Sequence, residues 1–113
     1  MIAKQDLRIG NWVSFNDRHI GQVFDTVIEL CFNHLKLENQ GYFFDYNAVK
    51  PIALTPSIFD KCIFSNEFNG VLIDGKFHFK VELYTIQVPH IDSLHLLQNF
   101  HYFLMNEELT ITL

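Results

Sequence analysis

Two cysteines and six histidines are the side chains of this sequence that could carry nucleophilic or metal chemistry. Cys31 and Cys62 are separated by thirty residues, a spacing that fits neither a CxxC redox pair nor a zinc knuckle. Neither cysteine is accompanied by a motif that supplies a base or an oxyanion donor, so both are expected to be free, mostly buried and inert thiols. The histidines form no helical pair four residues apart. They are His19, His34, His78, His90, His95 and His101.

Three further features argue against catalysis. His101 projects into the apolar arc of a C-terminal helix and is expected to be a core or interface histidine with satisfied hydrogen bonds. Glu107 and Glu108 follow that helix and are expected to face solvent. The five glycines are isolated, so no phosphate-binding loop is present. The sequence therefore predicts no enzyme, no catalytic residue, no cofactor and no metal.

Composition and charge limit the class of protein. The 113 residues suit one domain (1–113), with an N-terminal sheet in 1–50 and a C-terminal α+β part in 51–113. The net charge of −5 opposes a polyanion, which disfavours nucleic acid and anionic membranes. The sequence has no apolar run long enough to span a bilayer and no export signal at its start. A cytoplasmic protein without membrane association is expected.

The N-terminal half alternates short strand-like runs with turn residues, which predicts a meander of about four strands. Arg8–Val13 and Gly21–Val23 resemble the opening of Src-homology-3-like small barrels. An open curled sheet is the equal alternative. The expected strands are Asn11–Phe15, Gly21–Leu30, His34–Glu38 and Tyr42–Phe44.

The C-terminal half mixes helices with strands. Thr55 and Pro56 predict the start of a helix of about two turns, with Cys62 on its inner face. Asp74-Gly75 predicts a hairpin whose second arm, Lys76–Leu83, alternates apolar and polar residues. Further strands are expected over Thr85–Val88 and Leu109–Leu113. Altogether the sequence predicts a strand-rich α+β fold.

A long amphipathic helix is expected after Asp92 or Ser93, and it ends near Asn106. Its apolar arc covers more than half of the circumference, more than packing on a sheet requires. The arc comprises Leu94, Leu96, Leu97, Phe100, Phe103, Leu104 and Met105. The opposite, polar face is a candidate interaction surface, formed by His95, Gln98, Asn99 and Tyr102.

Three segments carry a resemblance to a known family. They are Asp6–Asn11, Pro51–Thr55 with Lys61-Cys62, and His95–Asn99 with Glu107–Leu109. In these segments the chain resembles a family of small uncharacterised proteins that is common in Bacteroidetes genomes, often near prophage or other mobile-element genes. Where that family has a helix-stopping Gly, this chain has Asn106, which tolerates the same left-handed conformation. The resemblance implies a genetic context and no mechanism.

Two functions of different classes remain. The first is a protein-interaction module of a phage or mobile element, which binds a protein partner or its own copy. The second is a nucleic-acid accessory protein, and charge disfavours it. Its candidate patch on the N-terminal sheet comprises Arg8, Trp12, Arg18 and His19.

Overall fold

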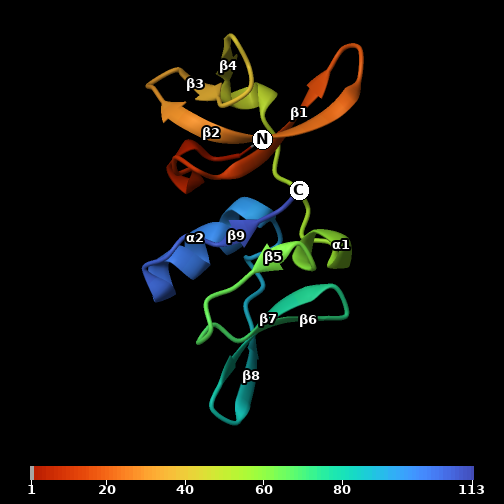
Figure 1. The fold of residues 1–113 in the computed structure, drawn as a ribbon, viewed down its shortest axis with the longest axis vertical. Helices are drawn as coiled ribbons and strands as arrows, with labels where there is room; N and C mark the ends of the chain where they lie inside the picture. Colours follow the sequence, from red (N-terminus) through yellow and green to blue (C-terminus); the bar gives the residue numbers. More distant parts are fainter. Residues whose placement is uncertain (1) are drawn as a thin grey trace. The chain divides into compact units, whose positions relative to one another are not determined.

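The computed structural model describes residues 2–113 and has a mixed, strand-rich α+β fold (Figure 1). The chain divides into two compact units, Met1–Ile52 and Ala53–Leu113. The division falls next to Pro51, where the hydrophobic period of the sequence changes. Each unit has its own secondary structure and is described separately.

The first unit contains a four-stranded antiparallel sheet with strand order β1-β2-β3-β4, which confirms the predicted meander. Short 3-10 helices, η1 (Lys4–Asp6) and η2 (Tyr46–Ala48), precede and follow it. The strands are β1 (Trp12–Asp17), β2 (Gly21–Leu30), β3 (His34–Leu37) and β4 (Phe43–Asp45).

The sheet is curled because the long strand β2 pairs with β1 along one part of its length and with β3 along another. Its first part pairs with β1, and its second part pairs with β3 after a register shift between Val27 and Glu29. Such irregularities bend a strand and increase its twist. Beyond β4 the chain returns to β1, where Ser14 and Lys50 exchange backbone hydrogen bonds of 2.9 and 2.8 Å.

Apolar residues from all four strands form the core of this unit, together with residues near its start and end. A buried carboxylate, Asp25, fixes the turn between β3 and β4. It accepts hydrogen bonds from the backbone N–H of Thr26 and of Asn39, and from the side-chain amides of Asn39 and Gln40. The sequence did not single out Asp25. The core comprises Ile2, Leu7, Val13, Phe15, Val27, Leu35, Leu37, Phe44 and Val49.

The second unit begins with the short helix α1 (Pro56–Phe59), whose start is the predicted one: the Thr55 hydroxyl accepts a hydrogen bond from the Ile58 N–H. The predicted length was wrong. The helix ends at Phe59, and Cys62 lies in strand β5 (Cys62–Ile63), which pairs with the C-terminal strand β9 (Thr110–Ile111). Pairing with a distant segment overrode the local helical spacing of the apolar residues.

A three-stranded antiparallel sheet follows, formed by β6 (Gly70–Ile73), β7 (Lys76–Val81) and β8 (Tyr84–Gln87). Asp74 and Gly75 join β6 to β7, and both have positive φ angles, as a tight hairpin turn requires. Figure 1 shows the β7–β8 hairpin extending away from the rest of its unit.

The expected half-buried alternation holds only for the beginning of β7. Phe77 is buried and Phe79 half-buried, whereas Val81 is exposed. Leu83, expected on the inward face, lies in the β7–β8 turn and is 97% exposed. The strand and its alternation are present, but nothing in this unit covers the outer part of the hairpin.

The helix α2 (Leu94–Met105) packs on this sheet through aromatic rings. The Phe100 ring lies 5.8 Å from that of Phe77 and 5.5 Å from that of Phe79, centroid to centroid. Phe68 contacts both strand residues and Phe100 as well. With twelve residues, α2 is the longest helix in residues 2–113, and none of these helices is long and apolar enough to cross a membrane.

Candidate interaction surface

The predicted polar face of α2 does not form an open surface. His95 and Gln98 are only 3% and 2% exposed, Asn99 is half-buried, and Tyr102 alone of the four is exposed. Leu94, Leu97 and His101 are fully buried. The helix is therefore rotated about its axis relative to the prediction.

The width of the apolar arc explains this error. When the apolar arc covers more than half of the helix, several different sides of the helix could pack on the sheet. The side of the helix around Leu94 and Leu97 is buried, and the adjacent polar residues His95 and Gln98 are buried with it. Phe103, nine residues after Leu94, then lies on the opposite side of the helix and is 83% exposed.

His101 shows why a polar residue can occupy the buried side. Its Nε2 atom accepts a hydrogen bond from the Ser65 backbone N–H at 3.0 Å, so its Nδ1–H donates to the Glu107 carbonyl oxygen at 2.9 Å. The rings of Phe64 and Phe68 flank the imidazole. This confirms the interpretation of His101 as a core histidine whose hydrogen bonds are satisfied.

The rotation of α2 leaves an apolar group of side chains exposed near its C-terminal end. We call Tyr102, Phe103 and Leu104 the α2 patch. The patch follows directly after Phe100, the residue that anchors the helix on β7. The helix then ends at Asn106, whose left-handed conformation (φ 54°) is the one expected from the sequence. Exposed aromatic side chains on an ordered helix are typical of protein-binding surfaces.

A second exposed apolar group lies on the β7–β8 hairpin. It comprises Val81, Leu83, Tyr84 and Ile86, which we call the hairpin patch. Phe79 and Ile86 are cross-strand neighbours, as are Val81 and Tyr84. Since residues two apart on a strand share a face, the hairpin patch extends the buried face of Phe79 outward. Leu83, in the turn, completes it at the tip.

The four residues of the predicted nucleic-acid patch do not come together. Trp12 begins β1, with Arg8 four residues earlier, whereas Arg18 and His19 lie in the turn after Asp17 at the other end. Six strand residues span about 20 Å, so the two pairs cannot form one patch. The strand β1 separates them.

Two other pairs on the first unit each combine a lysine with an exposed aromatic ring. Lys36 and Phe43 are cross-strand neighbours, with the Lys36 Nζ atom 5.9 Å from the ring centroid. The Lys4 Nζ atom lies 4.7 Å from the ring centroid of Phe32, which is 84% exposed. Tyr42 is exposed as well. The exposed aromatic residues Phe32, Tyr42 and Phe43 on either side of Lys36 are the sequence signal that could have identified the second of these pairs.

The Cys62 thiol is not activated. Both cysteines are free and half-buried. Burial raises the pKa of the Cys62 thiol to about 11, so this group stays protonated at neutral pH. Within residues 2–113, no three His, Cys, Asp or Glu side chains lie close enough together to hold a metal ion.

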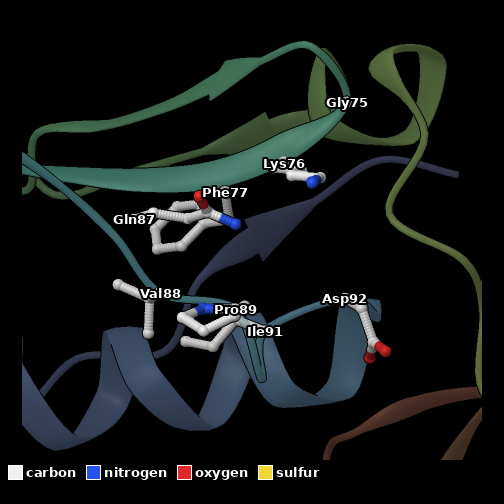
Figure 2. A pocket seen from close by; sticks show the side chains of 8 residues that line it. All are labelled: Gly75, Lys76, Phe77, Gln87, Val88, Pro89, Ile91 and Asp92. Carbon is white, nitrogen blue, oxygen red and sulfur yellow. The ribbon is translucent and has the colours of Figure 1, made fainter.

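The second unit also contains a pocket of about 340 Å³ between the sheet and the segment that leads into α2 (Figure 2). Phe77, Val88, Pro89 and Ile91 supply apolar lining, and Lys76, Gln87 and Asp92 supply polar groups. The volume is at the lower end of those that hold small molecules. The lining includes no cysteine, serine or histidine that could act as a nucleophile or base.

Comparison of the chain with family models, with curated proteins and with solved structures finds no match. The resemblance to the Bacteroidetes family therefore stays a prediction.

Proposed function

We propose that this protein is a non-catalytic interaction module that binds another protein through the α2 patch. The observation that carries the proposal is the exposure of Phe103 on a helix whose other side is packed on the sheet. A phenylalanine held at the surface by an ordered helix loses little conformational entropy on binding and buries a large apolar area. The net charge of −5 favours a protein partner over a polyanion.

The resemblance to proteins encoded near prophage genes adds a source for the partner. We propose that the partner is encoded by the same phage or mobile element. The α2 patch thereby takes the place of the polar face of α2 as the proposed binding surface, and Tyr102 belongs to both.

The test is copurification of the tagged protein with the products of neighbouring genes, expressed together. Phe103→Ser with Leu104→Ser should abolish copurification of the partner, because it removes the apolar side chains of the α2 patch. Ile20→Ser is the control, since Ile20 is 75% exposed, close to the 83% of Phe103, but lies in the β1–β2 turn. Equal copurification by the patch variant and the control would rule out the α2 patch as the binding surface.

Nucleic-acid binding is the second candidate, and a specific observation favours it. We propose the Lys4–Phe32 and Lys36–Phe43 pairs for this role, because exposed rings next to lysines can stack on bases and neutralise phosphates. Fluorescence anisotropy with a labelled single-stranded oligonucleotide tests it. Binding that weakens with salt and is lost in Phe43→Ala would support this candidate.

For the first unit we propose a Src-homology-3-like small barrel. The hydrogen bonds between Ser14 and Lys50 support it, because they join the segment after the last strand to the free side of β1. The helix η2 separates that segment from β4.

A further inference from the structure

The strand β8 forms one edge of its three-stranded sheet, because the strand order is β6-β7-β8. All four of its residues, Tyr84–Gln87, are exposed. An edge strand presents a row of backbone N–H and C=O groups that can pair with another strand. The register with β7 decides which residues present them.

Val81 and Tyr84 flank the two-residue turn between β7 and β8, so they form a hydrogen-bonded pair. Such pairs alternate along an antiparallel ladder, and Phe79 with Ile86 is therefore the next one. The hydrogen bond from the Val88 N–H to the Phe77 carbonyl oxygen, at 3.0 Å, shows that Phe77 and Val88 are the following hydrogen-bonded pair of this alternation. It follows that Thr85 and Gln87 direct their backbone groups away from β7, toward the edge.

This edge lacks the features by which proteins normally prevent edge pairing. β8 contains no charged residue and no proline, and its register with β7 is regular over all four pairs. Lysine, proline and bulges are the usual protection of such an edge. On one face of the hairpin, moreover, the exposed side chains of Tyr84 and Ile86 offer apolar area that a neighbouring strand would cover.

We propose that two copies of the chain associate through β8, with the two edges antiparallel, to form a continuous six-stranded sheet. An antiparallel edge is complementary to itself under a two-fold rotation. With the rotation axis at Ile86, Thr85 of each copy pairs with Gln87 of the other, and both donors meet acceptors. The two Ile86 side chains then lie next to each other across the axis and extend the apolar face.

The charge distribution opposes a second copy less at this place than at the acidic parts of the chain. The chain carries a net charge of −5, so two copies repel each other on average. The segment 76–87 contains two lysines, Lys76 and Lys80, and one glutamate, Glu82, and so has a small positive excess. Contact through this hairpin therefore brings together the least acidic surfaces of the second unit. A four-residue edge is small, and we expect a weak, concentration-dependent dimer.

This inference rests on the proposed function in that it assigns a second interaction, with a further copy of the chain, to the same module. The two interactions use different residues. The variant with Phe103→Ser and Leu104→Ser should keep the dimer and lose the partner, whereas variants in β8 should lose the dimer and keep the partner. Failure of one proposal is thus distinguishable from failure of the other.

Light scattering and sedimentation across a wide range of protein concentrations test the dimer. Thr85→Pro removes an N–H that points to the edge and leaves the β7–β8 ladder intact, so it should yield a monomer. Thr85→Val keeps the N–H and should dimerise as the unchanged chain does. Ile86→Lys places two like charges at the axis and should also yield a monomer. An unchanged chain that stays monomeric at every concentration, or a Thr85→Pro variant that dimerises equally well, would overturn the proposal.

Amide hydrogen exchange measured by NMR gives a residue-specific readout. The amides of Tyr84 and Ile86 donate to β7 in the ladder and should be protected at every concentration. The amides of Thr85 and Gln87 should exchange rapidly in dilute protein and slowly in concentrated protein. Protection of Thr85 and Gln87 that does not change with concentration would contradict pairing of the two edges.

Discussion

The Nε2 atom of His101 in α2 accepts a hydrogen bond from the backbone N–H of Ser65, thirty-six residues earlier in the chain. The same histidine holds the Glu107 carbonyl oxygen, and the Ser65 hydroxyl donates to the Glu107 carboxylate at 2.7 Å. One imidazole therefore ties the loop after β5 to the segment that follows α2. Its role is structural, since both ring nitrogens are occupied by backbone groups.

We expect His101→Phe to destabilise the protein by about 1–3 kcal/mol, because the Ser65 N–H and the Glu107 carbonyl lose their partner. Urea unfolding followed by circular dichroism measures the effect. His90→Phe, at an exposed site, serves as the control and should shift stability by less than about 0.5 kcal/mol. Equal stability of the two variants would show that the imidazole contributes nothing to the second unit.

Gly70 stands where the aromatic core leaves no room. A Cβ atom there would lie 2.8 Å from the Cε1 atoms of both Phe68 and Phe77. Gly70→Ala should therefore cost about 1–3 kcal/mol in the free energy of unfolding. At Gly41 a Cβ atom meets nothing within 4 Å, so Gly41→Ala should be neutral or slightly stabilising. Thermal unfolding of the two variants compares them, and a Gly70→Ala protein as stable as Gly41→Ala would contradict the packing described.

The rotation of α2 predicts opposite outcomes for two leucines on the same helix. Leu97 is fully buried, and Leu97→Ala should cost about 2–5 kcal/mol. Leu104 is 43% exposed, and Leu104→Ala should cost less than about 1 kcal/mol. Denaturant unfolding of both variants measures the difference. A loss at Leu104 as large as that at Leu97 would contradict the orientation of the helix described here.

The raised pKa of Cys62 predicts a dependence of stability on pH. The unfolded thiol loses its proton before the folded one, so between the unfolded pKa and about 11 the unfolded state binds fewer protons. Stability should therefore decline with rising pH in that window. Denaturant unfolding of the unchanged chain and of Cys62→Ala over this window should show a shallower decline in the variant. Parallel declines would mean that Cys62 does not contribute.

Local patterns predicted the elements whose causes are local. The bounds of β2 follow from turn residues on either side of an apolar run, and the start of α1 follows from Thr55 and Pro56. The end of α2 at Asn106 belongs to the same class, because a left-handed cap depends on one residue.

The candidate surface was less accessible to sequence reasoning. The hydrophobic period places Phe103 and Leu97 in one broad arc, but only neighbouring segments decide which part of that arc is covered. The role of Asp25 likewise depends on Asn39 and Gln40, which donate hydrogen bonds to its carboxylate from the turn after β3. Equally, a strand of six residues separated the basic side chains that composition alone had grouped.

The sequence by itself determined the strand-rich α+β class, the four-stranded meander and the positions of the main turns, because these depend on the period and on residues adjacent in the chain. The tertiary structure decided the rotation of α2, the assignment of Cys62 to a strand and the exposure of the hairpin tip. Each of these features depends on a partner far along the chain. Ser65 holds His101 on the buried side of α2, and Ile111 pairs with Cys62 in a strand. Phe100 packs on Phe79 but does not extend to Tyr84 and Ile86, which stay exposed.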